Sequence, residues 1–291
     1  MNRSTNVPGP GTVRIAGVQM DIALGDVAAN LAAILERLAV AASQGSRLVV
    51  FPECALTGYC CDSREEARTL AETIPGPRTE KIQQLCRQLD VCVVVGTLEA
   101  AASGIYNACV LIGPQGVVGR YRKVHLPYLG VDRFVAAGDE PFAVHDLGGL
   151  RVGMNICYDA SFPEACRTLA LQRADLIVLP TNWPPGSENA AKYMINTRAM
   201  ENHLYFAAVN RVGVERGFEF IGLSKICDVS GETLAAADRV PTILYADIEP
   251  AQARNKRIIR VPKKHEIDRF ADRRPEFYGL LTAEKKRLDS A

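Results

Sequence analysis

The chain has 291 residues, enough for one large domain or two small ones, and 48% of them are hydrophobic, which suffices for a sizeable core. Its 34 basic and 33 acidic residues give a formal charge of +1, so no net field would attract it to nucleic acid or an anionic membrane. No apolar run approaches the length of a bilayer span. Residues 1–12 lack the apolar segment of a signal peptide, and we expect them to be disordered in a soluble, cytoplasmic protein.

The first half of the chain alternates between strand and helix patterns. Asp26 is placed to cap a helix that runs to about Ser43, with Leu31, Ile34, Leu35 and Leu38 on one face. Further helices are expected at residues 64–70 and 79–89. Apolar runs indicate strands at residues 13–20, 47–53, 91–98, 106–112 and 117–122.

The second half repeats this alternation. We expect strands at residues 141–147, 151–156, 175–180, 205–212, 220–229 and 242–248, and a helix at 189–202. From residue 250 the chain is polar and basic, with nine Lys or Arg against four acids in 250–280. Because the whole chain is nearly neutral, we interpret this tail as a solvated face or an inter-subunit arm rather than a nucleic-acid patch.

Two strand segments resemble each other. Residues 47–53 (RLVVFPE) and 175–184 (DLIVLPTNWP) are buried strands that end at a proline and open into a loop. This similarity indicates a doubled β-α-β arrangement, with two sheets inside, helices outside and no linker that divides it. Active groups in layered α/β folds gather where strands end, and Glu53, Cys157 and Asn182 all fall at such positions.

Cys157 follows an apolar strand and precedes a helical pattern. Ser161 and Glu164 have the spacing of a capping box, and Pro163 suits the first helical turn. A helix amino terminus favours an anion, so this position predicts a stabilised thiolate. A buried structural cysteine would fit the local sequence equally well.

The other cysteines carry no metal-site pattern. The nine are scattered, odd in number and without a C-x-x-C pair, which argues against structural zinc. Free thiols in a reducing cytosol are the simplest interpretation, with Cys92 and Cys109 as small core residues.

A cysteine nucleophile needs a base and a positive group for the oxyanion. Glu53 closes an apolar strand, where burial would raise its pKa and make it a proton acceptor, and Lys123 is the matching cation. Each residue alone is equally well explained as an ordinary ion-pairing or surface residue. A Cys–His pair that uses His125 is the alternative, whereas the remaining histidines are expected to be packed or exposed.

Three ordered blocks, FPECALTGY, YRKVHLP and NICYDASFPE, resemble the signature blocks of the nitrilase superfamily of carbon–nitrogen hydrolases, and the likeness runs from residue 13 to about 275. The resemblance implies an α/β fold, a four-layer α-β-β-α sandwich, with a Glu53–Lys123–Cys157 triad and neither metal nor organic cofactor. It also implies a homodimer or higher homo-oligomer whose C-terminal arms cross between subunits. We therefore expect a hydrolase domain at 13–262 and an arm at 263–291.

The chain departs from the family at one position. Many members carry a second glutamate about ten residues beyond the lysine, but no glutamate lies between Val124 and Asp139. Asp132 is the nearest candidate to replace it in substrate binding, and Glu140 lies further on. Asp132 could instead pair with Arg133.

The resemblance also bears on the substrate. Tyr158–Asp159 follows the cysteine, as in amidases and N-carbamoyl amide hydrolases, where nitrile-cleaving members usually have Trp–Glu. We therefore expect cleavage of a small amide or N-carbamoyl compound through a cysteine thioester, which releases ammonia or an amine and a carboxylic acid. The substrate-binding candidates, beside Asp132, are Tyr59, Tyr128, Tyr158, Asn182 and Trp183.

The sequence leaves three alternatives open. The same triad could hydrolyse a nitrile, or the chain could be an idle member that binds a metabolite. A thiol-based redox sensor would use Cys60, Cys61 and Cys157.

Overall fold

The computed structural model describes residues 11–283, so most of the segment expected to be disordered lies outside the described residues. The chain divides into two units, one that ends at Arg254 and one that begins at Asn255. The larger unit contains both main sheets, and the smaller one contains a hairpin and two 3-10 turns. No helix between residues 11 and 283 is long and apolar enough to cross a membrane.

The first sheet has the strand order β14-β1-β2-β3-β4-β5. Strands β1, β2 and β3 run parallel at its centre, and β14, β4 and β5 are added antiparallel. The bounds are β1 Val13–Gln19, β2 Leu48–Val50, β3 Cys92–Ala101, β4 Gly104–Gly113, β5 Gly116–Arg122 and β14 Thr242–Ile248.

The second sheet has the order β13-β12-β9-β8-β7-β6, again with three parallel central strands, β7, β8 and β9. Its bounds are β6 Val144–Asp146, β7 Arg151–Met154, β8 Leu176–Pro180, β9 Tyr205–Val209, β12 Lys225–Cys227 and β13 Thr233–Ala236. Strands β2 and β8 occupy equivalent central positions in the two sheets. The doubled arrangement expected from their similar sequences is therefore confirmed.

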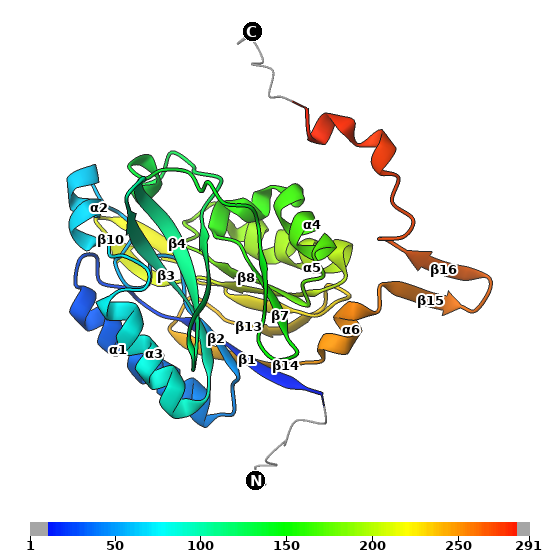
Figure 1. The fold of residues 1–291 in the computed structure, drawn as a ribbon, viewed down its shortest axis with the longest axis horizontal. Helices are drawn as coiled ribbons and strands as arrows, with labels where there is room; N and C mark the ends of the chain where they lie inside the picture. The colour runs from blue at the N-terminus through cyan, green and yellow to red at the C-terminus, as the bar shows by residue number, and fades with distance from the viewer. Residues whose placement is uncertain (1–10, 284–291) are drawn as a thin grey trace. The chain divides into compact units, whose positions relative to one another are not determined.

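The two sheets pack face to face with helices on their outer faces (Figure 1). Gly17 of β1 leaves room for Val209 of β9, and the sulfurs of Cys109 in β4 and Met154 in β7 are 3.7 Å apart. Helices α1 Val27–Ser43 and α3 Pro77–Leu89 cover the first sheet, whereas α4 Pro163–Leu171 and α5 Ile195–Asn202 cover the second (Figure 1). The α-β-β-α order of the layers is confirmed.

Helix α1 shows how local sequence sets an element. The Asp26 side chain accepts a hydrogen bond from the Ala29 N–H at 3.0 Å, which caps the helix as expected. Leu31, Ile34 and Leu38 are buried against the first sheet. The shorter helices are α2 Arg64–Leu70, α6 Pro250–Arg254 and the 3-10 turns η1 Gly130–Arg133 and η2 Cys157–Ser161.

The expected capping box at Ser161 is wrong. Ser161 ends the 3-10 turn η2, and the residue before α4 is Phe162, which provides no side-chain cap. Pro163 does occupy the first helical turn. Helix α4 therefore begins six residues after Cys157.

Three other expected elements are corrected. The strand expected at 205–212 divides into β9 and β10 Val212–Glu215, and between them the Asn210 backbone N–H donates to the Ser224 hydroxyl at 2.8 Å instead of to a strand carbonyl. The strand expected at 220–229 divides into β11 Phe218–Ile221 and β12, because Gly222 and Leu223 have positive φ. The helix expected at 189–202 begins with a π-helical turn, η3 Ala190–Met194.

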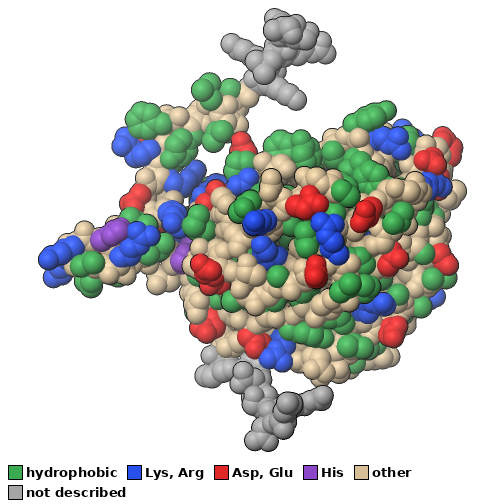
Figure 2. Space-filling view, turned by 180° about the vertical axis from the view of Figure 1, so that it is seen from behind, with side chains coloured by type: hydrophobic (Ala, Val, Ile, Leu, Met, Phe, Trp, Pro, Cys, Tyr) green, Lys and Arg blue, Asp and Glu red, His purple; other side chains and the backbone are tan. Residues whose placement is uncertain are grey.

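The smaller unit contains regular structure that was not predicted from the sequence. Strands β15 Arg257–Val261 and β16 His265–Asp268 form an antiparallel hairpin, followed by η4 Pro275–Phe277 and η5 Gly279–Leu281. Ile259, Val261, Phe277 and Leu280 are exposed. Over the larger unit, acidic and basic side chains are interspersed on the face drawn in Figure 2, as the near-neutral charge implies.

We expect Gly96 to be required for both stability and the position of Glu53. A Cβ at Gly96 would lie 2.5 Å from the Cys54 nitrogen and 2.7 Å from the Glu53 Cα, so Gly96→Ala should cost about 1–3 kcal/mol of unfolding free energy. Gly153→Ala is the control, because the atoms nearest to its Cβ, at 3.0 Å, belong to the flexible Leu169 side chain rather than to backbone. Urea unfolding measures both, and equal costs would contradict this account.

Candidate active site

Glu53 lies just beyond β2, fully buried where the loop passes close to Gly96. Its Oε1 atom accepts hydrogen bonds from Lys123 Nζ and from Asn107 Nδ2, both at 2.7 Å. Its Oε2 atom is buried and has no hydrogen-bond partner among residues 11–283. The carboxylate is thus held by one oxygen while the other remains available.

Lys123 follows β5 directly and is also fully buried. Its ammonium group donates to Glu53 Oε1 and, at 2.5 Å, to Asp132 Oδ2. Its nitrogen lies 5.8 Å from the centre of the Tyr59 ring. A lysine with these two carboxylate partners is fixed in both position and charge.

Asp132 belongs to the turn η1 and faces the lysine. It accepts hydrogen bonds from Tyr59 Oη and from Asn107 Nδ2, each at 2.8 Å, in addition to the bond from Lys123. The alternative pairing with Arg133 is wrong, because Arg133 donates to the carbonyls of Gly130 and Cys61.

Cys157 is the first residue of η2, with a φ of 45° that non-glycine residues rarely adopt. It is 8% exposed. Burial, and next the charge of Glu53, raises its pKa to about 12, although Lys123, the Thr181 side chain and the Asn182 backbone lower it. The predicted stabilised thiolate is wrong for this resting state, because desolvation outweighs the cationic neighbour and α4 begins too far along the chain.

The pKa values of Glu53 and Lys123 are both raised, but for different reasons. Burial raises the pKa of Glu53, as the sequence predicted, and the charge of Lys123 only partly offsets this. Burial alone would lower the pKa of Lys123, but the charges of Glu53 and Asp132 outweigh it and raise the pKa well above the usual value. The site therefore pairs a lysine whose charged form is favoured with a carboxylate of increased basicity.

The other predicted binding residues differ in placement. Tyr59 is buried with its hydroxyl on Asp132, and Tyr158 is partly exposed, with its ring edge-to-face on Phe162 at 5.1 Å. Asn182 is buried, and neither its amide nitrogen nor its amide oxygen has a partner among the described residues. Trp183 is buried, and its backbone N–H donates to Asn210 Oδ1 at 2.9 Å.

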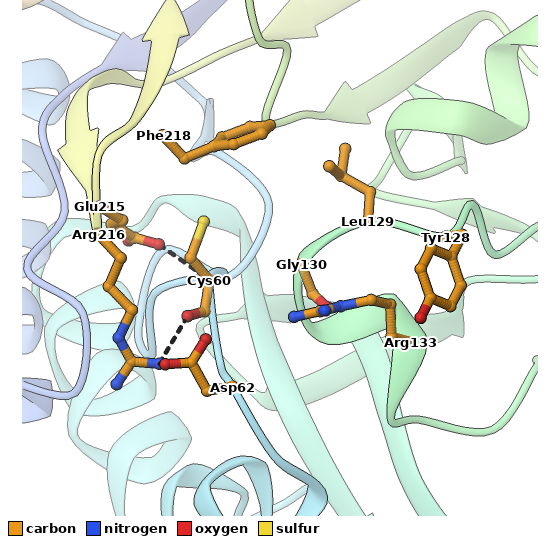
Figure 3. A pocket seen from close by; sticks show the side chains of 9 residues that line it. All are labelled: Cys60, Asp62, Tyr128, Leu129, Gly130, Arg133, Glu215, Arg216 and Phe218. Atoms are coloured by element: carbon orange, nitrogen blue, oxygen red, sulfur yellow. Dashed lines mark hydrogen bonds and ion pairs between the residues drawn. The ribbon is translucent and has the colours of Figure 1, made fainter.

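Tyr128 is 91% exposed and lines a pocket of about 270 Å³ beside the Tyr59 loop. Figure 3 shows Tyr128 and Arg133 across this pocket from Arg216. The lining residues are Cys60, Asp62, Tyr128, Leu129, Gly130, Arg133, Glu215, Arg216 and Phe218. Glu215 accepts hydrogen bonds from the backbone N–H groups of Tyr59 and Cys60, at 2.9 and 2.8 Å, and so ties the pocket wall to the Tyr59 loop.

Asn107 was missed by the motif analysis. It lies in β4, is fully buried, and donates from one amide nitrogen to both Glu53 and Asp132, while its backbone carbonyl accepts the Lys123 N–H at 2.8 Å. The available signal was a carboxamide inside an apolar run, YNACVLIG, where a buried polar group requires partners.

The structure supports neither the Cys–His pair nor the thiol-based redox sensor. The His125 Nδ1 atom is 2.7 Å from Asp159 Oδ1, so its hydrogen bond goes to an acid rather than to Cys157. Burial raises the pKa of both Cys60 and Cys61 to about 12, as it does the pKa of Cys157, so none of the three is the low-pKa thiol that is typical of a redox sensor. Among residues 11–283, no group of three His, Cys, Asp or Glu side chains is arranged to hold a metal ion.

We expect the alkylation rate of Cys157 to rise continuously from pH 6 to pH 10, because its raised pKa keeps the thiol protonated throughout that range. Iodoacetamide labelling, with mass spectrometry of the Cys157 peptide, measures the rate. A plateau below pH 7 would show that the thiolate is already formed and would contradict the assignment.

Asn107→Asp should disrupt the site, because it places a third carboxyl group against Glu53 and Asp132. Loss of a hydrogen bond to a charged group costs about 1.5–3 kcal/mol, and the like charges add to it. We expect Cys157 alkylation near pH 8 to change at least threefold while the thermal midpoint shifts. An unchanged rate and midpoint would show that Asn107 does not hold the two acids.

Comparison with known proteins agrees with this architecture. Residues 14–258 match the model of the carbon-nitrogen hydrolase family. A protein named nitrilase from Pyrococcus abyssi is 39% identical over 269 residues, which cover 91% of this chain and 99% of that protein. An (R)-stereoselective amidase from Pseudomonas sp. is 32% identical over 93% of this chain and 94% of its own length.

A solved structure shares the fold as well. The crystal structure of an amidase from Nesterenkonia sp. superposes with a TM-score of 0.78, covers 96% of this chain and 100% of its own, and is 24% identical. The chain is therefore a carbon-nitrogen hydrolase, a member of the nitrilase superfamily whose three sequence blocks it carries.

Proposed function

We propose that this enzyme hydrolyses a small amide or N-carbamoyl compound, with Cys157 as nucleophile, Glu53 as general base and acid, and Lys123 as oxyanion donor. The observation that carries the proposal is the buried, unpartnered Oε2 of Glu53, on a carboxylate whose other oxygen is fixed by Lys123 and Asn107. A raised pKa suits this carboxylate to proton transfer near neutrality.

The base is needed because the nucleophile is a poor acid. With a pKa of about 12, only about one Cys157 thiol in 10⁵ would be ionised at pH 7. Attack must therefore be coupled to proton removal. The Cys157 S–H proton moves to Glu53 Oε2 as the sulfur bonds to the carbonyl carbon of the substrate, and the carbonyl π pair becomes the oxyanion.

Lys123 Nζ and the Tyr158 backbone N–H hold that oxyanion. Loss of one such donor typically costs about 3 kcal/mol in a transition state. As the tetrahedral intermediate collapses, the carbon–nitrogen bond breaks and Glu53 returns its proton to the departing nitrogen. Ammonia or an amine leaves, and the acyl group remains on Cys157 as a thioester.

In hydrolysis of the thioester, water is the nucleophile and the Cys157 sulfur is the leaving group. Glu53 removes a proton from water, the hydroxide oxygen bonds to the acyl carbon, and the carbon–sulfur bond breaks. The sulfur recovers its proton from Glu53, and the carboxylic acid is released. The cycle restores each residue and needs only water as second substrate, with no cofactor.

Other residues have supporting roles in this proposal. Asp132 takes the place of the family's second glutamate by orienting Lys123 and Tyr59. The unpartnered carboxamide of Asn182, next to the backbone that interacts with Cys157, is available for a polar substrate group. Tyr59 and Trp183 supply aromatic surface, whereas Tyr128 would meet a substrate only at the exposed pocket.

Amides are favoured over nitriles because Tyr158–Asp159 follows the cysteine, and a relative at 32% identity is named an amidase. Nitrile hydrolysis is the second candidate, since the relative at 39% identity is named a nitrilase. We further propose a cytoplasmic homo-oligomer. In it, residues 13–262 form the hydrolase domain and residues 263–291 form an arm between subunits. Residues 284–291 of that arm lie outside the described residues.

Ammonia release from aliphatic amides, N-carbamoyl amines and nitriles tests the function. We expect turnover of amides or ureides, a loss of at least 10⁴-fold in Cys157→Ala, and a loss of about 10³-fold or more in Glu53→Gln. Cys227→Ala, which removes a buried thiol in β12, is the matched control and should retain activity.

The outcomes separate the candidates. Nitrile turnover without amide turnover would overturn the substrate assignment but keep the triad. Full activity in Cys157→Ala would overturn the nucleophile. Ligand binding in a thermal-shift screen, with no hydrolysis of any hit, would indicate an idle metabolite-binding member.

The pH profile provides a separate check. Because the pKa of Glu53 is raised, its active carboxylate form is lost at a higher pH than for an ordinary glutamate. We expect kcat/KM to fall below this elevated pKa, with an acid limb above pH 4.5. An acid limb at or below that value would contradict a buried Glu53 as base.

A further inference from the structure

Asp159, two residues beyond Cys157, is a fully buried carboxylate that the proposed reaction does not use. Its Oδ2 atom accepts hydrogen bonds from the Ile156 N–H at 2.9 Å and from Tyr121 Oη at 2.8 Å. Its Oδ1 atom accepts from the His125 N–H at 3.0 Å and lies 2.7 Å from His125 Nδ1. Four donors therefore converge on one acid.

The donors come from both sides of the active site. Ile156 precedes Cys157 in its own turn, whereas Tyr121 and His125 stand two residues before and two residues after Lys123. Asp159 thus connects the turn of the nucleophile to the segment of the lysine, at two points that flank Lys123. A shift between these segments would break two or more of its hydrogen bonds.

The hydrogen bond from the Ile156 N–H to the Asp159 carboxylate spans Cys157, whose backbone conformation is unfavourable. Cys157 has a φ of 45°, and a non-glycine residue in that region costs about 1–3 kcal/mol unless its surroundings fix it. The Asp159 carboxylate closes the turn across Cys157 and holds this conformation. Cys157 is thereby kept in a geometry that its own backbone preference opposes.

The His125 ring provides a second contact with the same turn. It stacks on Phe162, with ring centroids 3.7 Å apart and planes at 11°. Phe162 in turn meets the ring of Tyr158 edge-to-face at 5.1 Å. The packed rings of His125, Phe162 and Tyr158 therefore fix the position of the Tyr158 backbone. This matters because the Tyr158 N–H is the proposed oxyanion donor and must point at the substrate.

We propose that Asp159 and His125 are a positioning pair that fixes the Cys157–Tyr158 turn in register with Lys123. This inference rests on the proposed function for its kinetic consequence, but not for its geometry. Neither residue touches the substrate: each acts through the turn, so its loss should affect the chemical step more than substrate binding.

The test compares His125→Ala and Asp159→Asn with His145→Ala, which alters a histidine in β6 outside this network. We expect His125→Ala to lower kcat about 10- to 100-fold, the effect of losing a charge-assisted hydrogen bond, with KM within about threefold. Added imidazole should recover part of the kcat, because the His125 site is partly exposed and the ligand can restore both the donor and the stack. His145→Ala should retain kcat.

A second measurement is independent of turnover. We expect Cys157 alkylation near pH 8 to change at least threefold in His125→Ala, since the turn that carries the thiol is no longer fixed. Rates and kcat within about twofold of the parent would overturn the inference. A loss of kcat matched by a lower thermal midpoint, without imidazole rescue, would also overturn it, because that pattern indicates a structural role alone.

The two proposals fail separately. If the parent enzyme hydrolyses no amide, ureide or nitrile, the proposed function fails, while the alkylation rates still report on the positioning pair. If Asp159→Asn does not fold, the His125→Ala variant and its rescue by imidazole decide whether His125 and Asp159 position the Cys157 turn.

Discussion

The structure of the site depends on one buried cation. Lys123 is fully enclosed, and burying an ammonium ion without partners would cost far more than a protein domain can sustain. Glu53 and Asp132 compensate its charge, and Asn107 donates to both acids. Removal of one partner from such a buried pair typically costs about 3–5 kcal/mol, so these residues act as a unit.

The doubled fold explains how residues so distant in sequence meet. Glu53 follows the central strand of the first sheet, and Cys157 follows β7, beside the central strand of the second. Because the sheets pack face to face, strand ends from both halves converge, and β5 adds Lys123. Burial by this packing raises the pKa of both Glu53 and Cys157. In the proposed mechanism the raised pKa of Glu53 favours its role as base, whereas the raised pKa of Cys157 makes that base necessary.

Much of the fold and of the candidate site could be predicted from the sequence. The features that were missed or predicted wrongly all depend on tertiary packing. Motifs located Glu53, Lys123 and Cys157, and Asp26 located the start of α1, because these signals are local. Asn107 was missed because its role arises from the placement of β4 between β3 and β5. The predicted thiolate at Cys157 is wrong because the burial imposed by tertiary packing, which the local sequence does not show, raises the pKa of the thiol.

Rapid-quench mass spectrometry on an amide substrate tests the central claim most directly. The account predicts that, within one turnover, the Cys157 peptide gains the mass of the acyl group and that Glu53→Gln abolishes this adduct. Product formed with no adduct at any time, or an adduct on another of the nine cysteines, would contradict it.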